Sequence, residues 1–399
     1  MNMDDMIRMD EYCSSVRDGT HDTPKPTADG FNLVTSKAII NNMIDLSVCY
    51  YISEKDYMKI NERSKVDKWD VIMSMIGTVG RLHLVTYDPN YAIKNIALFK
   101  IGNEDRAKWL YYYLSTTTVQ NYFELIASGT SQHFIGLGHL RRLKVKNYSI
   151  HSKRINDILS AYDNLIVVNK NRIKALEQMA KNLYEEWFVR FRFPGHETAE
   201  FENGIPTGWI QRRADQAIVF NPTIGDSKQD QYTIIPMESL STSSMVLDSN
   251  GFVIQDSLSG KRSQNGDTLF AKITPCLENG KTGFVMGMPE GTVCGGSTEF
   301  IILRAKTLTP HYVYFLARSY YFRQTAILSM NGADGRQRVD EHKMKSTKII
   351  QPSKAILDAF EGYVSPVFEM IHRLVLENNN LIRQRDFLLP RLMSGKLEV

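Results

Sequence analysis

The sequence predicts an α+β fold. Two mixed α/β domains are combined with two long helices that pair as an antiparallel coiled coil, and a pseudo-twofold internal repeat relates the two halves. Three observations predict it: two long segments of helical period, a strand-rich region ahead of each, and short stretches that recur in the same order. The 399 residues exceed one ordinary domain, and roughly 150 residues per domain predicts two or three.

The first helical segment runs from about Ser152 to Phe188. Its apolar residues recur at spacings of three and four, which is typical of a broad helical stripe buried against a partner. The expected pairing residues are Ile155, Tyr162, Leu165, Ile173, Leu176 and Leu183. Asn169 lies inside that stripe, where a polar side chain can fix the pairing register.

The second helical segment runs from about Ser353 to Leu392. Its expected pairing residues are Val367, Ile371, Leu374, Leu381 and Leu388, and Asn378 interrupts the stripe. We expect Pro366 near the helix start or at a kink, and Pro390 to end the regular helix or bend its last turn. Each helix would span about 55 to 60 Å. Two such helices in one chain are most simply explained by pairing with each other.

The regions ahead of the two helices are patterned as strands. In the first half these are "DVIMSMIG" and "RLHLVTY", and in the second half "QYTIIPM", "GFVIQ", "DTLFAKI", "TGFVMG" and "STEFIILRA". The segment from about Val189 to Trp209 contains Pro, Gly and acidic residues without a clear period, which indicates a linker.

Several short stretches align between the halves. The aligned positions are Asp70 with Asp267, Gly80-Arg81 with Gly280-Lys281, Val85 with Val285, Ile135 with Val339, and Leu140 with Met344. Their common order, rather than overall identity, indicates a duplication.

The net charge, the cysteines and the apolar runs bear on which classes of protein are expected. The net charge of +4 neither indicates nor excludes a nucleic-acid partner. Cys13, Cys49, Cys276 and Cys294 have no metal-ligand spacing, so we expect reduced, mostly buried thiols. The N-terminal stretch lacks a signal-peptide pattern, and no run of about 18 apolar residues occurs, so a cytoplasmic protein without membrane contact is expected.

Three motifs resemble catalytic signatures and fail on inspection. "LFAKITPCLENGKTGFV" ends like a phosphate-binding loop, but Pro275 occupies the first glycine position and a strand pattern follows. "FIGLG" resembles the cofactor motif of adenine methyltransferases, but no Asn-Pro-Pro-aromatic tetrapeptide accompanies it. Glu341-His342-Lys343 lacks the upstream Pro-Asp of a nuclease site. We therefore expect no catalytic, cofactor-binding or metal-binding residue in this chain.

Basic residues instead cluster at the end of both strand-rich regions. They are Arg141, Arg142, Lys144 and Lys146 in the first half, and Arg336, Arg338, Lys343, Lys345 and Lys348 in the second. Gln132, His133 and Gln337 lie beside them. Arg and Lys suit guanine edges and Gln suits adenine edges, so both clusters favour DNA recognition.

Longer stretches carry a family resemblance. They are "VRDGTHDTPKPTADGF", "DTLFAKITPCLENGKTGFV", "GGSTEFIILRA", "RFPGHE" with "GIPTGW", and "LIRQRDFLLPRLMSGKLEV". With them the chain resembles the specificity subunit of Type I restriction-modification systems, over nearly its whole length.

The resemblance implies a domain plan: a first target recognition domain over 1–150, a central helix over 151–190, a linker over 191–208, a second recognition domain over 209–350 and a C-terminal helix over 351–399. Each recognition domain would bind one half of a split double-stranded DNA target, and the helices would set the spacer between the halves. The expected DNA-contacting residues are Thr20, His21, Lys37, Arg81, Gln132 and His133 in the first half, and Lys272, Lys281, Thr298, Arg336, Gln337 and Arg338 in the second.

The resemblance also implies partners. Two methyltransferase subunits would bind the chain and supply S-adenosylmethionine and adenine methylation, so no cofactor is expected in this chain itself. Two motor-nuclease subunits would join them for restriction. Two alternatives stay open: a catalytic fused DNA-modification enzyme, and a coiled-coil adaptor without direct DNA contact.

Overall fold

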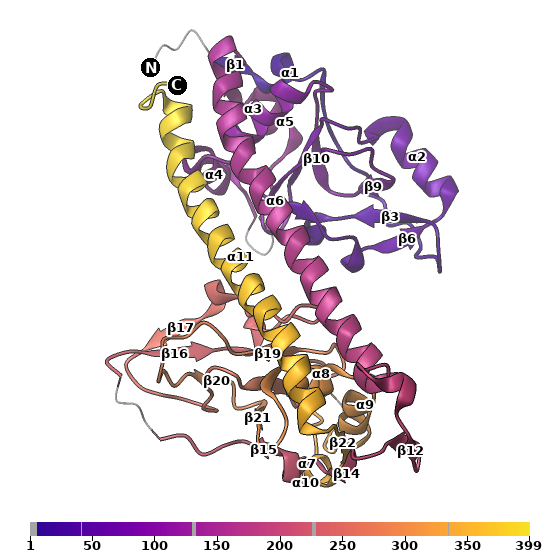
Figure 1. Cartoon of the computed structure of the whole chain (residues 1–399). Helices are drawn as coiled ribbons and strands as arrows, with labels where there is room; N and C mark the ends of the chain where they lie inside the picture. Colours follow the sequence, from indigo (N-terminus) through magenta and orange to yellow (C-terminus); the bar gives the residue numbers. More distant parts are fainter. Residues whose placement is uncertain (1–5, 41, 130–132, 226–228, 334) are drawn as a thin grey trace. The chain divides into compact units, whose positions relative to one another are not determined.

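The computed structural model describes residues 6–40, 42–129, 133–225, 229–333 and 335–399 (Figure 1). The chain divides into two compact units. Unit 1 comprises Met1–Ile166 and Asn379–Val399, and unit 2 comprises Val167–Asn378. Two long helices, α6 (Ile150–Tyr184) and α11 (Lys354–Ser394), each contribute residues to both units.

Unit 1 is built on a four-stranded sheet and a three-stranded sheet. The strands are β1 (Met6–Arg8), β2 (Ser15–Asp18), β3 (Phe31–Val34), β4 (Ile39–Ile40), β5 (Met43–Ile44), β6 (Tyr50–Ile52), β7 (Val71–Ser74), β8 (Leu82–Leu84), β9 (Tyr91–Ile93), β10 (Ile96–Lys100) and β11 (Lys144–Lys146). The helices are α1 (Met9–Tyr12), α2 (Glu54–Ser64), α3 (Glu104–Leu114), α4 (Thr117–Ile126), α5 (Leu137–Arg142) and the 3₁₀ turns η2 (Ser36–Ala38) and η3 (Leu46–Val48). The sheet orders are β2-β10-β7-β8 and β6-β3-β9, with short pairs β1-β11 and β4-β5.

Unit 2 has the same plan. Its strands are β12 (Phe201–Glu202), β13 (Ile205–Pro206), β14 (Ile210–Arg213), β15 (Ile218–Phe220), β16 (Tyr232–Ile235), β17 (Val253–Gln255), β18 (Thr268–Ala271), β19 (Thr282–Phe284), β20 (Gly295–Gly296), β21 (Phe300–Ala305) and β22 (Lys348–Gln351). Its helices are α7 (Ala214–Ala217), α8 (Pro310–Arg318), α9 (Tyr320–Leu328), α10 (Glu341–Ser346), the π-helical turn η4 (Glu185–Val189) and the 3₁₀ turns η5 (His196–Thr198), η6 (Met237–Ser239) and η7 (Ser249–Gly251). The sheet orders are β15-β21-β18-β19 and β17-β16-β20, with short pairs β12-β13 and β14-β22.

The predicted internal repeat is confirmed at the level of topology. The four-stranded sheets match strand for strand, and each three-stranded sheet pairs its middle strand antiparallel on one side and parallel on the other. Gly80 and Gly280 adopt left-handed φ angles of 84° and 80° ahead of β8 and β19. A side chain on either would press on Gln120 of α4 or Arg323 of α9. An equivalent glycine turn therefore packs on an equivalent helix in each unit.

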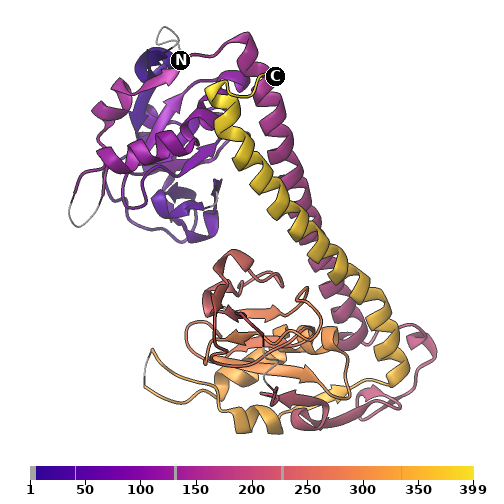
Figure 2. The ribbon, with the colours of Figure 1, turned by 90° about the vertical axis from the view of Figure 1, so that its left-hand side faces the viewer.

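In unit 1 the beginning of α6 lies beside the end of α11 (Figures 1 and 2). Ile155 and Leu159 of α6 share one hydrophobic core with Leu389, Leu392 and Met393 of α11 and with the helices that cover the four-stranded sheet. The helices run antiparallel there (Figure 1). Arg385 Nη1 of α11 lies 2.6 Å from Asp163 Oδ1 of α6. Tyr112 of α3 donates to the other oxygen of Asp163 at 2.7 Å.

In unit 2 the end of α6 lies beside the beginning of α11, again antiparallel. The rings of Tyr184 and Trp187 lie 6.3 Å and 6.0 Å from the ring of Phe360. Asn169 and Asn378 are 3% and 6% exposed, so both polar interruptions of the predicted stripes are buried in this unit. The fold class predicted from the sequence, with mixed α/β units and two long antiparallel helices, is confirmed.

Three positions in the long helices bear on the expectations. Pro390 does not end α11, which continues to Ser394, and Pro366 lies inside the helix with Gly362 four residues before it. Leu165 is 48% exposed while Ile166 is 5% exposed, so the buried stripe of α6 passes through Ile166. The stripe drifts because 3.6 residues per turn do not divide seven evenly.

The segment expected as a linker is packed on unit 2. It contains η5 and the β12-β13 hairpin. Phe193 and Trp209, with ring centroids 5.1 Å apart, are both buried in the main core of the unit. Gly195, Gly204 and Gly208 adopt left-handed φ angles in its turns, whereas Glu202 and Pro206 lie in the hairpin strands.

Candidate nucleic-acid interface

Apart from Lys37, which lies on η2, the expected DNA-contacting residues within the described ranges lie along the edge of each four-stranded sheet where its strands begin or end. In unit 1 this edge is formed by residues 18–22, 74–81, 95 and 133–134. In unit 2 it is formed by residues 221–224, 272–281, 298–299 and 336–341. We call these segments the polar edges.

Backbone hydrogen bonds hold both polar edges in the same way. In unit 1, Ile135 N donates to Met75 O at 3.0 Å and Gly77 N donates to His133 O at 2.9 Å. In unit 2, Val339 N donates to Lys272 O at 2.9 Å and Thr274 N donates to Gln337 O at 3.1 Å. His133 and Gln337 therefore occupy equivalent positions, directly beside the turn that leaves β7 or β18.

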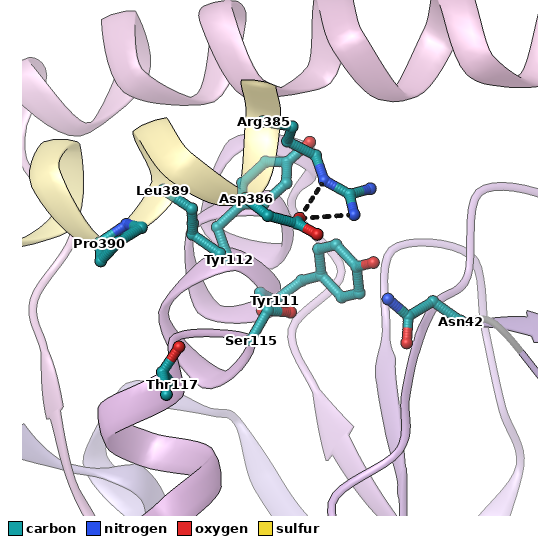
Figure 3. Close-up of a pocket in the computed structure, with 9 residues that line it drawn as sticks. All are labelled: Asn42, Tyr111, Tyr112, Ser115, Thr117, Arg385, Asp386, Leu389 and Pro390. Atoms are coloured by element: carbon teal, nitrogen blue, oxygen red, sulfur yellow. Dashed lines mark hydrogen bonds and ion pairs between the residues drawn. The ribbon is translucent and has the colours of Figure 1, made fainter. Parts of the chain in front are cut away.

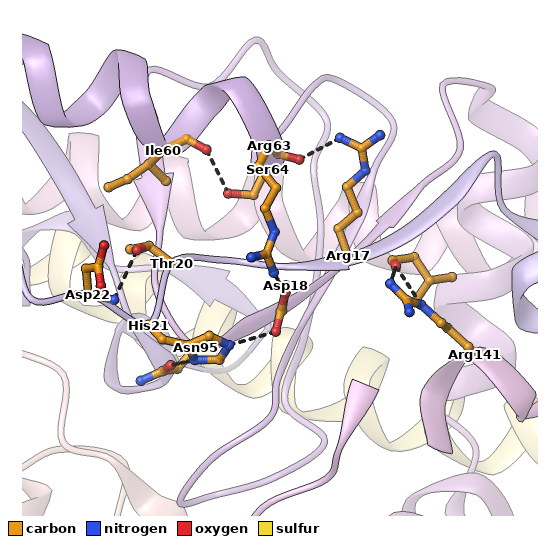
Figure 4. A network of polar contacts seen from close by, with 11 residues as sticks. Arg17, Asp18, Thr20, His21, Asp22, Ile60, Arg63, Ser64, Asn95 and Arg141 are labelled. Atoms are coloured by element: carbon orange, nitrogen blue, oxygen red, sulfur yellow. Dashed lines mark hydrogen bonds and ion pairs between the residues drawn. The ribbon is translucent and has the colours of Figure 1, made fainter. Parts of the chain in front are cut away.

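In unit 1 the edge is organised around Asp18, whose side chain is 8% exposed (Figure 4). One oxygen of Asp18 pairs with Arg63 of α2. The other lies 2.9 Å from His21 Nε2, while His21 Nδ1 lies 2.8 Å from Asn95 Oδ1. The imidazole is thereby fixed by both nitrogens, although 62% of its side chain remains exposed. Thr20 Oγ1 accepts from Asp22 N at 3.1 Å and stabilises the same loop.

The side chains of the other candidates in unit 1 differ in their exposure and in whether they already bond to the protein. Arg81 Nη1 donates to Ile39 O at 3.1 Å, beside η2, which carries exposed Lys37. The side chain of His133 is exposed. Gln132 lies outside the described residues.

In unit 2 the edge carries a fork-shaped ion pair. Arg338 Nη2 donates to Glu299 Oε1 at 2.7 Å and Arg338 Nε donates to Glu299 Oε2 at 2.9 Å. The hydrogen bond from Arg338 holds the pKa of Glu299 below its ordinary value. The side chain of Arg338 is nevertheless 51% exposed.

The remaining candidates of unit 2 surround this pair. Lys272 Nζ lies 3.7 Å from Glu341 Oε1, and Gln337 N donates to Thr274 Oγ1 at 3.1 Å. Thr298 and Arg336 are exposed. Lys281 is placed differently: its Nζ donates to Met237 O at 3.0 Å, beside η6. The contact repeats the one that Arg81 makes beside η2.

A hollow of about 240 Å³ adjoins the polar edge of unit 2. Its lining includes Asn221, Pro222, Lys261 and Arg262. Asn221 Nδ2 donates to Glu341 Oε2 at 2.8 Å, and Arg262 Nη1 donates to Ile224 O at 2.6 Å. The hollow therefore combines two cations with an amide, which is a donor set that suits phosphate and base edges.

Comparison with known proteins points to one family. No family model matches the chain. It is 23% identical over 306 residues to the Type I restriction enzyme MjaIX specificity subunit of Methanocaldococcus jannaschii, covering 73% of this chain and 69% of that protein. It is 27% identical over 189 residues to the Type I restriction enzyme EcoAI specificity subunit of Escherichia coli, covering 45% of this chain and 32% of that protein.

A solved structure has the same fold. The S subunit of the Type I restriction-modification system from M. genitalium matches with a TM-score of 0.54 and 12% identity, over 97% of this chain and 95% of that one. The chain resembles Type I specificity subunits in sequence and in fold. The family resemblance predicted from the sequence motifs is thereby confirmed.

The three motifs that resemble catalytic signatures have structural roles in this fold. The stretch with the phosphate-loop ending forms β18, a loop and β19, whose strands pair antiparallel without an intervening phosphate-binding helix. Glu341 is held by Asn221 and Lys272. Gly136 is the residue before α5, and Phe134 bridges to Ile76 in the edge itself.

The cysteine and acidic side chains of the described residues show no arrangement typical of a reactive thiol or a metal site. All four cysteines are unpaired, and burial raises the pKa of the Cys13 thiol to about 12 and that of Cys294 to about 11. Within the described ranges, no group of three or more His, Cys, Asp or Glu side chains is placed to hold a metal ion. In the same part of the chain, no helix combines the length and the apolar character needed to cross a membrane.

Sequence reasoning missed several members of the polar edges. Asn95 and Asn221 hold His21 and Glu341, and both adopt left-handed φ angles, 54° and 49°. Asparagine tolerates this conformation, so an Asn at a strand boundary was the available signal. Glu299 carried no such signal, because an acidic residue next to a strand is ordinary.

Proposed function

We propose that this chain is a non-catalytic DNA-specificity subunit that recognises a bipartite double-stranded target, one half-site at each polar edge. One observation carries the proposal: the same edge of the same sheet, built twice, presents exposed side chains with nitrogen donors, His133 in unit 1 and Arg336 and Arg338 in unit 2. Such donors are the groups that read base edges and bind phosphates.

The two edges carry different donors, which supports two different half-sites. Unit 1 presents the imidazole of His133, while the two ring nitrogens of His21 already contact Asn95 and Asp18, and unit 2 presents Arg336, Arg338 and Gln337. The exposed fork of Arg336 suits the O6 and N7 of guanine, and the glutamine amide suits adenine. Arg338, whose fork already holds Glu299, suits a phosphate. The fold is therefore repeated while the recognition chemistry is not.

The domain plan follows from this assignment. Residues 1–150 and 209–350 would read the half-sites, 191–208 would join them, and the helices within 151–190 and 351–399 would connect the two readers and fix their spacing. The helix-pairing residues named from the sequence, apart from the exposed Leu165, would keep that connection rigid. Localisation in the cytoplasm, where the DNA target is, belongs to the same proposal.

Partners would supply the chemistry. A chain with two similar halves offers two similar surfaces, so it can recruit two copies of one partner. We propose two methyltransferase subunits that carry S-adenosylmethionine and flip the target adenine, and two motor-nuclease subunits for restriction. The present chain would contribute recognition and assembly.

Sequencing of methylated DNA tests the proposal. Cells would express the proposed partner methyltransferase with the wild-type chain, with the Arg336→Ala/Arg338→Ala variant, or with the control Lys354→Ala. The side chain of Lys354 is 86% exposed at the start of α11. The arginine variant should relax base preference in one half-site and keep it in the other. The control should keep both.

Two outcomes would contradict the proposal. Unchanged methylation in the arginine variant would favour an adaptor that does not touch DNA. Binding of S-adenosylmethionine by the isolated chain, measured by calorimetry, would favour a fused modification enzyme.

A further inference from the structure

A cavity of about 290 Å³ lies inside unit 1, between the end of α3 and the last part of α11 (Figure 3). Its lining includes Tyr111, Ser115, Thr117, Arg385, Asp386 and Leu389. None of its lining residues belongs to the polar edges. Its volume exceeds the roughly 10 to 15 Å³ that one water molecule needs. The internal repeat identifies what fills the equivalent space in unit 2.

The repeat aligns Ser115 with Arg318. Each residue stands directly before the N-cap of the next helix, Thr116 for α4 and Ser319 for α9. Two further hydrogen bonds fix the same alignment. Trp109 Nε1 donates to Lys146 O, and Tyr312 OH donates to Ile350 O, both at 2.9 Å.

In unit 2 the guanidinium of Arg318 joins helix α8 to the loop after η6. Its Nη1 donates to Ser244 O at 3.2 Å and its Nη2 donates to Thr242 O at 3.1 Å. The guanidinium carbon lies 5.9 Å from the centre of the Tyr314 ring. Glu177 of α6 accepts from Ser244 Oγ at 2.5 Å and from Met245 N at 2.8 Å, so an acid completes the arrangement.

Unit 1 keeps the tyrosine of this arrangement, and it has Ser115 where unit 2 has Arg318. Tyr111 takes the place of Tyr314, while Ser115 turns its hydroxyl back to Tyr111 O at 2.7 Å. Asp386 of α11 supplies the acid. Its Oδ1 accepts from Arg385 Nε at 2.9 Å and Nη2 at 2.8 Å, and its side chain is 55% exposed.

The net charge of the side chains around the cavity favours the binding of one more cation. Arg385 bonds to two carboxylates, Asp163 and Asp386, so the group of three carries one net negative charge. A tyrosine ring beside that charge favours a planar cation, which can stack on the ring and donate in its own plane. A compact ammonium ion matches such a site less well.

We propose that this cavity binds a guanidinium group, in the place that Arg318 fills in unit 2. The group comes either from an arginine side chain of a protein partner or from a free guanidino compound. The chemistry of the site is the same in both cases.

Methylguanidinium is the probe, and methylammonium is the matched control of equal charge. Hydrogen exchange of the isolated full chain should show slower exchange of α3 and α4 with methylguanidinium and no change with methylammonium. Ser115→Arg should abolish the response, because its own guanidinium would fill the cavity. Arg318→Ser should create the same response in α8 and α9.

Three results would overturn the proposal: no response of the wild-type chain, an equal response to methylammonium, or a response that persists in Ser115→Arg. Since Ser115→Arg can misfold, Asp386→Asn gives a second variant, and it should weaken the response about tenfold in concentration, roughly 1.4 kcal/mol.

A further measurement distinguishes the sources of the guanidinium. With the methyltransferase partner bound, a response that disappears indicates that a partner arginine occupies the cavity. A response that persists indicates a free ligand. This arm alone rests on the proposed function, because the isolated chain tests the site without any partner.

Discussion

The carboxylate of Asp267 accepts two hydrogen bonds from Arg304, each 2.7 Å long, directly ahead of β18. At the equivalent position of unit 1, Asp70 accepts from Lys100 Nζ at 2.6 Å. Both aspartates are almost completely buried, at 1% and 0% exposure. Each therefore ties the first residues of one central strand to the end of its neighbour.

Replacing Asp267 should destabilise unit 2 specifically. Asp267→Ala leaves Arg304 without its partner, and breaking such a buried pair typically costs about 3 kcal/mol. Hydrogen exchange should accelerate in β18 and β21 while β7 and β10 keep their protection. Asp70→Ala is the matched control and should show the reverse pattern. Equal acceleration in both sheets would contradict this division of roles.

The Glu299–Arg338 pair should restrain DNA binding. Glu299→Gln removes the charge that competes with phosphate for Arg338, so affinity should rise and one more phosphate contact should steepen the salt dependence by about 0.9. Titration of duplex DNA at several salt concentrations measures this. An unchanged slope would mean that Arg338 stays on its protein partner.

The same pair gives a pH dependence of known sign. The folded pKa of Glu299 is lowered, so its stabilising contribution is complete above the unfolded pKa and is lost as the pH falls through the folded value. The wild-type chain should therefore lose more stability than Glu299→Gln as the pH falls below about 4.5, the ordinary glutamate value. If urea unfolding gave the same pH dependence of stability for the wild-type chain and Glu299→Gln, the ion pair would not contribute to stability.

Lys281 tests whether a candidate DNA contact is structural. Its ammonium is already bonded to Met237 O, so Lys281→Ala should lower the free energy of unfolding by about 1 to 2 kcal/mol. The salt dependence of DNA binding should stay the same. Lys37→Ala, at an exposed position in unit 1, is the control that should leave stability unchanged. A changed salt slope for Lys281→Ala would restore its role as a phosphate contact.

The last turns of α11 should stabilise unit 1. Leu392 is 1% exposed in its core, and Leu392→Ala should cost about 2 to 5 kcal/mol through the cavity that it leaves. Exchange should accelerate in β7 and β10. Leu376→Ala, at a position that is 53% exposed, is the control expected to leave both units protected.

Thiol labelling should follow burial. Burial raises the pKa of Cys13 to about 12 and of Cys294 to about 11, so neither forms much thiolate near neutral pH. Cys276, which is only partly buried, should react first with a disulfide reagent. Rapid labelling of Cys13 in the native chain would indicate that unit 1 opens readily.

The sequence was informative where one period or one short pattern decides the structure. The long helices follow from their apolar spacing, and β7 and β18 follow from the aligned Asp70 and Asp267. These features depend on neighbours in the chain, so local patterns reveal them. The same is true of Gly80 and Gly280, which both need a left-handed turn.

The polar edges could be located only in part. Arg338 and Gln337 were found from their cluster, but whether a cation is free depends on partners far along the chain. Lys281 bonds a carbonyl 44 residues away, and Arg81 bonds one 42 residues away. Nor could spacing show that α11 continues past Pro390, since that depends on how its last turns pack in the core of unit 1.

The division of α11 between the units has a consequence for synthesis. Residues 379–399 complete the core of unit 1, yet the ribosome makes them after every residue of unit 2. The half that emerges first is thus the half that finishes folding last. Until Leu389 and Leu392 arrive, the incomplete core of unit 1 exposes apolar surface, which favours aggregation.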